Sequence, residues 1–274
     1  MINFIKDSLK SNSIIPSAIN SQMMSYYRQC IAIGGMPEVV QKYVDTKDFR
    51  AIDKIQRNLL MGYQYDIAHY ASVAEKVKAE KCYLSLGKQL LDKENHKFQY
   101  KEVENGGRAQ KYYSSIEWLI RADIIHLSRL VTDIRFDLDD YARDDFFIAY
   151  TTDLSLLMAM KDFSIKQHIV ENTLDGTSKG GGIYECAIAD ALYKKGLKIY
   201  FFKNQTKKRE LDFIIQNNGN VVPIEVKSSN NKSKSLSSIM KGNKIPYAYK
   251  FIDGNIGISE EGIITLPLYM AAFI

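Results

Sequence analysis

The sequence has only three cysteines, Cys30, Cys82 and Cys186, which are odd in number and far apart. This spacing predicts neither a disulfide framework nor a paired-cysteine metal site, and it fits a reducing compartment, so we expect a cytoplasmic protein. No stretch reaches the roughly 18 apolar residues that a membrane helix requires. The first residues, MINFIKDSLKSNS, lack the apolar core and cleavage site of a secretory signal, and we expect no membrane association.

Several catalytic motifs are missing as well. No GxSxG elbow indicates a serine hydrolase, and no GxGxxG follows a predicted strand to indicate a dinucleotide site. The histidines are scattered without HExxH spacing; they are His69, His96, His126 and His168. The LGK at Leu86–Lys88 has Cys82 where the P-loop requires glycine, so this chain carries no ATPase motif.

The composition that remains is that of a folded, water-soluble protein of 274 residues, 46% apolar and 25% charged. Of the net charge of +5, +4 comes from Thr151 onward, where 16 Lys and Arg face 12 Asp and Glu. A basic rim of this kind attracts phosphates, although a solvated surface explains so mild a bias equally well. The candidate nucleic-acid-binding residues are Lys207, Lys208, Arg209, Lys232 and Lys234.

The first half of the chain is predicted to be mainly helical. In GGMPEVV, Gly34–Val40, the glycine pair ends one helix and Pro37 begins the next. Phe49–Tyr70 is a long candidate helix because its apolar residues recur near a 3.6 period.

The segment from Ser72 to Leu130 resembles a winged helix. A helix at Tyr83–Leu91, a polar loop, a helix at Ala109–Arg121 and the strand-like DIIHLSRLV follow one another. That order is typical of DNA-reading modules, but many winged helices bind protein only. We expect Trp118 and the neighbouring tyrosines to be core residues rather than a base-stacking surface.

An acidic, aromatic segment at Phe136–Tyr150 lacks the glycine and the terminal glutamate of a calcium loop, so we interpret it as a solvated link. The remaining chain alternates helix and strand in the order helix, three strands, helix, strand. We therefore predict an α/β protein with three parts. These are a helical and winged-helix-like region at 1–135, a connector at 136–170 and a last domain at 171–274.

The strongest local signal is RELDFIIQNNGNVVPIEVKSS, which starts at Arg209. Asn218-Gly219 predicts a two-residue hairpin turn, since both positions need positive φ. Opposed residues then have numbers that sum to 437, as 218 and 219 do, so Asp212 faces Glu225 and Ile214 faces Pro223. Lys227 projects from the same face as Glu225 because strand side chains alternate.

Two carboxylates that face each other repel, and a divalent cation between them removes the conflict. Mg²⁺ binds one or two carboxylates plus water and substrate phosphate, polarises the phosphate and lowers the pKa of bound water. We predict Asp212, Glu225 and Lys227 as catalytic residues, with Mg²⁺ or Mn²⁺ as cofactor. Glu185 shares a predicted helix stripe with Ile188, Ala189 and Leu192, where a carboxylate is costly unless it is paired. The predicted metal ligands are therefore Asp212, Glu225 and Glu185.

Asp212, a spacer of twelve residues, and then Glu225-Val226-Lys227 resemble the PD-(D/E)XK nuclease superfamily. The resemblance implies a restriction-endonuclease-like αβββαβ core at 171–274 and an acid in its first helix, here Glu185. The acid-x-lysine triplet alone occurs often by chance, whereas the triplet, opposed aspartate, hairpin and element order together are more specific.

The wider chain is similar to the domain of unknown function 4143 family, the C-terminal part of AAA-type P-loop ATPases. The matching segments cover nearly the whole chain: AIGGMPEVV, YQYDIAHY, KFQY, YYSSIEWLI, DLSLL, IYE, RELDFII and VVPIEVKSS. We expect a metal-dependent, DNA-directed phosphodiesterase with a possible P-loop ATPase partner. The alternative is a catalytically inactive module that binds nucleic acid or protein.

Overall fold

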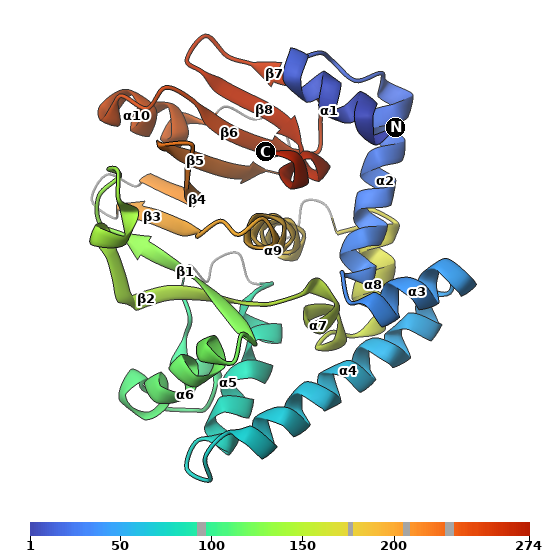
Figure 1. The fold of residues 1–274 in the computed structure, drawn as a ribbon, viewed down its shortest axis with the longest axis vertical. Coiled ribbons are helices and arrows are strands. Elements are labelled where there is room, and N and C mark those ends of the chain that lie inside the picture. The colour runs from blue at the N-terminus through green and yellow to red at the C-terminus, as the bar shows by residue number, and fades with distance from the viewer. Residues whose placement is uncertain (92–96, 175–177, 205–208, 228–232) are drawn as a thin grey trace. The chain divides into compact units, whose positions relative to one another are not determined.

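The computed structural model describes residues 1–91, 97–174, 178–204, 209–227 and 233–274, and Figure 1 labels its helices and strands. Contacts between Cα atoms divide the chain into two units. The sheet unit comprises residues 1–27, 128–147 and 187–274, and the helical unit comprises residues 28–127 and 148–186. Each unit therefore contains segments that are far apart in the sequence.

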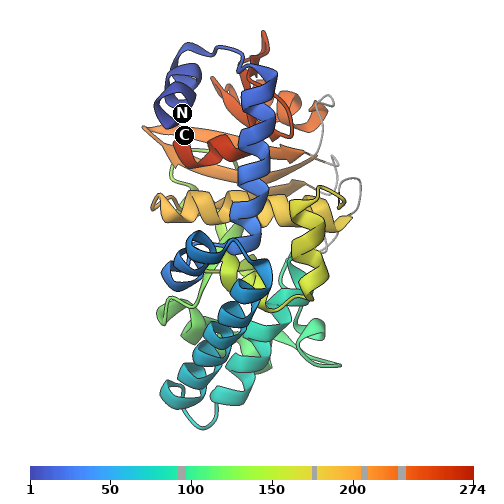
Figure 2. The ribbon, with the colours of Figure 1, turned by 90° about the vertical axis from the view of Figure 1, so that its right-hand side faces the viewer.

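Helix α4 (Phe49–Tyr70) organises the helical unit, because most of its other helices pack against it (Figures 1 and 2). These are α3 (Pro37–Thr46), α5 (Lys76–Gln89), α7 (Leu154–Ala159) and α8 (Phe163–Val170), while α6 (Ala109–Arg121) packs on α5. Helices α4 and α6 have the predicted bounds, and α3 begins at the predicted proline. Helix α5 begins at Lys76, seven residues before the predicted Tyr83. Small buried residues, Ala79 and Cys82, extend its inner face with little hydrophobic signal.

The aromatic residues of α6 divide between core and surface. Tyr112 is fully buried, as predicted, whereas Tyr113 is exposed. Trp118 is half-buried. The expected core position is therefore confirmed for Tyr112 and wrong for Tyr113.

The loop after α2 (Ser17–Ile33) is fastened to the start of α7. The backbone nitrogen of Gly35 donates to both carboxylate oxygens of Asp153, at 2.9 and 3.1 Å. The hydroxyl of Ser155 donates to the carbonyl of Ile33 at 2.8 Å. Gly34 has φ +77°, and a Cβ there would lie 2.1 Å from the Ser155 Oγ. The predicted helix break at the glycine pair is thus also a point of close approach.

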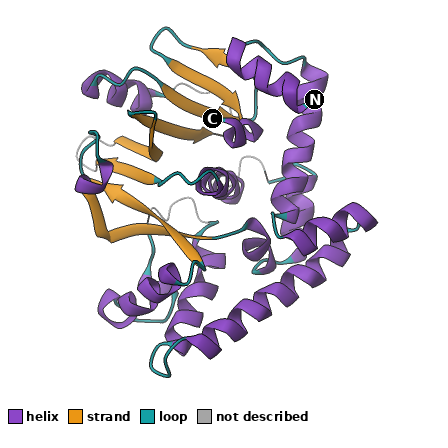
Figure 3. Ribbon diagram, in the orientation of Figure 1, coloured by secondary structure: helices purple, strands orange, loops and turns teal. Residues whose placement is uncertain are grey.

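The strands, orange in Figure 3, form one sheet in the order β2-β1-β3-β4-β5-β6-β8-β7. Their bounds are β1 (Ile125–Val131), β2 (Ala142–Thr151), β3 (Tyr200–Asn204), β4 (Arg209–Asn217), β5 (Asn220–Lys227), β6 (Ala248–Ile252), β7 (Gly257–Ile258) and β8 (Ile263–Pro267). Strands β3, β4 and β5 are antiparallel neighbours, whereas β6 is parallel to β5 and β8 is parallel to β6. With α9 (Ser178–Lys194) and α10 (Lys234–Asn243), the chain order is α9, β3, β4, β5, α10, β6. This is the predicted αβββαβ order.

The expected solvated link at 136–150 is wrong for its second half, which forms strand β2. After the half-buried Ala142, the strand exposes Arg143, Asp144 and Asp145, and then Phe147 and Ala149 are buried. An edge strand tolerates charges on its open side. The charged residues near the start of β2 therefore made the segment resemble a loop, although buried and half-buried positions alternate further along it.

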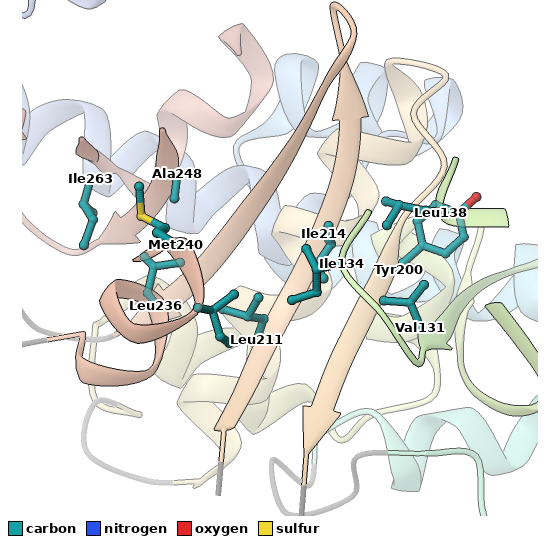
Figure 4. Packing of buried hydrophobic residues seen from close by; sticks show 11 residues of the cluster. Val131, Ile134, Leu138, Tyr200, Leu211, Ile214, Leu236, Met240, Ala248 and Ile263 are labelled. Atoms are coloured by element: carbon teal, nitrogen blue, oxygen red, sulfur yellow. The ribbon is translucent and has the colours of Figure 1, made fainter. Parts of the chain in front are cut away.

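One face of the sheet packs against α10. Leu236, Ile239 and Met240 of this helix share a core cluster with Leu211, Ile214 and Ala248 of the strands (Figure 4). The opposite face of β4 and β5 is also closed to solvent, since Phe213, Ile215, Val222 and Ile224 are each 0% exposed. The strands that carry the predicted site are therefore buried on both sides.

The N-terminal segment of the sheet unit is tied to the turn between β6 and β7. Ile15 lies between α1 (Ile2–Ser11) and α2. Its backbone N–H donates to the Oδ1 of Asn255, and its carbonyl accepts a hydrogen bond from the Nδ2 of Asn255. Asn20 donates to the carbonyl of Gly254 and accepts from the hydroxyl of Tyr269. Across the described residues, no helix has both the length and the apolar character needed to cross a bilayer.

Candidate active site

The hairpin of β4 and β5 forms with the predicted turn and register. Asn218 and Gly219 have φ values of 49° and 77°, as a two-residue turn requires. The ladder runs from Asn217–Asn220 to Phe213–Ile224, and it includes Ile214–Pro223. The predicted pairing is thus confirmed over this range.

Asp212 lies one residue beyond the last pair of the ladder, so the expected direct pairing with Glu225 is not part of it. A register shift with β3 explains the departure: Tyr200 pairs with Ile214 but Phe202 pairs with Leu211, which leaves an extra residue in β4. Such bulges redirect side chains. The half-buried Asp212 accepts a hydrogen bond at Oδ2 from the backbone nitrogen of Val226, 2.6 Å away.

Glu225 and Lys227 are brought together as the alternation predicted. The Nζ of Lys227 lies 3.0 Å from the Oε1 of Glu225. Glu225 is only 8% exposed, whereas the Lys227 side chain retains 30% exposure. The Oε2 of Glu225 is buried and has no hydrogen-bond partner among the residues that the structure describes. Burial of a carboxylate oxygen costs free energy unless a hydrogen bond or a cation compensates for the lost water.

Lys250 is a member of this group that the sequence reasoning missed. Glu225 and Lys250 are register partners of the parallel strands β5 and β6, so their side chains project from the same face. Lys250 is 5% exposed. Burial lowers the pKa of the Lys250 amine, Glu225 counters this by raising the pKa, and Lys227 lowers it further. The available signal was a single lysine inside the apolar strand YAYKFI.

Glu185, the third predicted metal ligand, lies on α9 and is half-buried. The residues predicted to share its stripe, Ile188, Ala189 and Leu192, are fully buried. In the described ranges, no three His, Cys, Asp or Glu side chains are grouped so as to hold a metal ion. A site with one or two carboxylates still fits Mg²⁺, which takes its other ligands from water and phosphate.

Most of the predicted nucleic-acid-binding residues lie where the structure gives no side chain. Lys207, Lys208 and Lys232 fall outside the described residues, and Arg209 begins β4 with only its backbone described. Lys234, the first residue of α10, is exposed. Their predicted role stays a prediction.

Two family models match the chain. Residues 24–167 match the family described as Domain of unknown function (DUF8612), and residues 180–269 match Domain of unknown function (DUF4143). The expected similarity to the second family is thus confirmed for the last third of the chain, while the part before it matches a different family. No curated protein and no solved structure matches the chain.

Proposed function

Because the chain belongs to the family described as Domain of unknown function (DUF8612), whose description assigns no activity, we propose a function from the site itself. The function is metal-dependent hydrolysis of phosphodiester bonds in DNA. Asp212 and Glu225 are the proposed metal ligands and Lys227 is the proposed catalytic lysine. Glu185 of α9, the third metal ligand that the sequence predicted, stays a prediction.

The observation that carries the proposal is the state of the Glu225 carboxylate. One oxygen lies 3.0 Å from Lys227, and the other is buried without a hydrogen-bond partner in the described part of the chain. A divalent cation at the second oxygen would satisfy it. The half-exposed Lys227 would then lie beside the cation and in reach of solvent.

Each residue has a distinct role in this proposal. When bound, Mg²⁺ or Mn²⁺ supplies Lewis-acid polarisation of the phosphate and a more acidic water. The backbone nitrogen of Val226 holds the Asp212 carboxylate in a fixed orientation. Lys227 neutralises negative charge on the phosphate or orients the attacking water, because its ammonium group is a flexible point charge.

The order α9, β3, β4, β5, α10, β6 supports a PD-(D/E)XK, restriction-endonuclease-like core, and we propose that assignment. We also propose that α5, α6 and β1 form the winged-helix-like region, which could bind either DNA or protein. The match to DUF4143 supports a further proposal, that a P-loop ATPase partner acts with this chain.

Nicking of supercoiled plasmid tests the proposal. Wild-type protein should nick DNA in Mg²⁺ or Mn²⁺ but not in EDTA, and Lys227→Ala should lose the activity. Lys203→Ala is a matched control, because Lys203 also sits on a strand beside a glutamate, 3.6 Å from Glu210, with 25% of its side chain exposed. Lys203→Ala should nick like wild type. Metal-dependent nicking that survives Lys227→Ala, or is absent from wild type, defeats the proposal.

A second candidate function is binding without catalysis, and the position of Lys250 favours it. Two lysines flank the Glu225 carboxylate, so their charges would neutralise it without a metal ion. An inactive module of this kind would retain DNA in EDTA and never cut it. A module that binds protein only would not retain DNA even at low salt, where phosphate contacts are strongest.

A further inference from the structure

A cleft of about 920 Å³ opens beside α10 in the sheet unit. Lys250 of β6 and Thr265 of β8, which are register partners, contribute to its lining. Helix α10, from its cap residue to its last turn, and the turn before β8 line it as well. The polar residues from these parts include Ser233, Lys234, Ser237, Ser238, Lys241 and Ser259. The size is that of a small-molecule site, which typically measures about 300–1,000 Å³.

Among the described residues, the cap residue of α10 does not satisfy the N-terminus of the helix. Ser233 occupies the cap position, but its side chain makes no capping hydrogen bond. It is 7% exposed, and its Oγ has no hydrogen-bond partner in the ranges that the structure describes. The first turn contains no acidic residue and begins with Lys234. A cation there opposes the helix dipole, so an anion bound at this end would offset both unfavourable features.

The charge of the cleft also favours an anion. The described residues that line it include three lysines, Lys234, Lys241 and Lys250, and one acidic residue, Glu261. The carboxylate of Glu261 is already engaged by Lys241, whose Nζ lies 2.7 Å away. Lys250 is 5% exposed and brings a largely desolvated charge to the cleft, and it shares the single charge of Glu225 with Lys227. Charge–charge attraction is stronger at such a site than at an exposed one.

We propose that this cleft binds a phosphomonoester of nucleotide size. A phosphate offers three acceptor oxygens and about −1.5 to −2 charge at neutral pH, which suits helix N–H groups, a serine hydroxyl and lysines together. The volume beyond the phosphate accommodates the rest of a mononucleotide. Glu225, Lys250 and Thr265 lie in one register row, so the cleft adjoins the candidate active site. Phosphomonoester binding does not depend on phosphodiester cleavage.

Calorimetric titration in EDTA tests binding without any contribution from metal-dependent cleavage. The probes are adenosine monophosphate, adenosine, inorganic phosphate, and one oligonucleotide with or without a 5′-phosphate. Adenosine monophosphate should bind saturably, more tightly than inorganic phosphate and at least tenfold more tightly than adenosine. If the 5′-phosphate increases oligonucleotide affinity, the phosphate comes from a nucleic-acid end. If only the mononucleotide responds, the ligand is a free nucleotide.

Variants locate the binding in the cleft. Ser233→Ala and Lys234→Met should each weaken adenosine monophosphate binding about tenfold, as the loss of a charge-assisted contact does. Ser233→Ala forfeits no capping bond, so folding should be unaffected. Lys250→Met should weaken binding further. Lys6→Met replaces an exposed lysine of α1 that does not line the cleft and should bind like wild type. Equal binding of adenosine and its monophosphate, or wild-type affinity in Ser233→Ala and Lys234→Met, overturns the proposal.

Discussion

The Oδ2 of Asp212 accepts a hydrogen bond from the backbone nitrogen of Val226, 2.6 Å away, just past the last pair of the β4–β5 ladder. The Asp212 carboxylate thus accepts the hydrogen bond that a backbone carbonyl of β4 would accept from Val226 in a regular ladder. Asp212 therefore has a structural contact in addition to its proposed role as a metal ligand. Mutagenesis can separate the two.

Replacement of Asp212 by asparagine should separate stability from activity. Asp212→Asn keeps an acceptor for Val226 and should change the free energy of unfolding by less than about 1 kcal/mol, whereas Asp212→Ala should cost about 1.5–3 kcal/mol. Both variants should lose metal-dependent nicking, because the carboxylate charge is gone. Urea denaturation and plasmid nicking measure the two effects. Equal stability losses in both variants would contradict the structural role.

Gly34→Ala should be strongly destabilising. The residue has φ +77°, and a Cβ would lie 2.1 Å from the Ser155 Oγ and 2.2 Å from the Ser155 nitrogen. Backbone strain and overpacking together should cost about 3 kcal/mol or more in the free energy of unfolding. Gly106→Ala is the matched control, since Gly106 has φ +74° with nothing within 4 Å of the added atom. It should cost only the strain, about 1–2 kcal/mol. Denaturant midpoints of the two variants would be the same if the clash did not matter.

The pair of Asp53 and Lys166 should respond asymmetrically to mutation. The Lys166 side chain is 0% exposed and bonds to Asp53, which also accepts from Arg57 at 2.8 Å. Burial lowers the pKa of the Lys166 amine, and Asp53 counters that effect. Asp53→Asn leaves a buried charge without its counterion and should cost about 3–5 kcal/mol in the free energy of unfolding. Lys166→Met leaves Asp53 with Arg57 and should cost about 1 kcal/mol or less. A larger loss in Lys166→Met than in Asp53→Asn, measured by urea denaturation, would reverse the expected order.

Glu104 should make stability depend on acid pH. Hydrogen bonds from Lys111, then Lys81 and Tyr112, lower the pKa of its carboxyl from 4.5 to about 2 in the folded chain. Because the Glu104 pKa is lower in the folded chain than in the unfolded chain, the ionised carboxylate stabilises the fold at pH values above 4.5. This contribution should be lost as the pH falls from 4.5 towards 2. The urea midpoints of wild type and Glu104→Gln should therefore converge over that range. Glu260→Gln, at an exposed position, should show no such convergence. High salt should reduce the stability difference between wild type and Glu104→Gln, because the ion pairs of Glu104 with Lys81 and Lys111 are exposed.

Strong local signals predicted a helix of the helical unit and the hairpin that carries the site. The 3.6 period gave the bounds of α4, and Asn218-Gly219 gave the register of the hairpin because the turn demands positive φ at both residues. The bulge at Asp212 escaped prediction because it arises from pairing with the third strand, β3. Lys250 was not predicted as a site residue because its position beside Glu225 depends on the pairing of β6 with β5. Local patterns also cannot show that residues 1–27 cluster with residues 187–274.

The exposed charges at the start of β2 have a consequence for how copies of the chain meet. Strand β2 is one margin of the sheet, and the guanidinium of Arg143 holds the carboxylate of Asp145 at 2.7 Å there. A second molecule that tried to extend the sheet would have to strip water from these ions. The other margin, β7, offers only Gly257 and Ile258 as a template. Both edge strands therefore disfavour fibril-like growth of the sheet. Strand β2 does so through its exposed ions, and β7 does so because it is too short to pair with a strand of a second molecule.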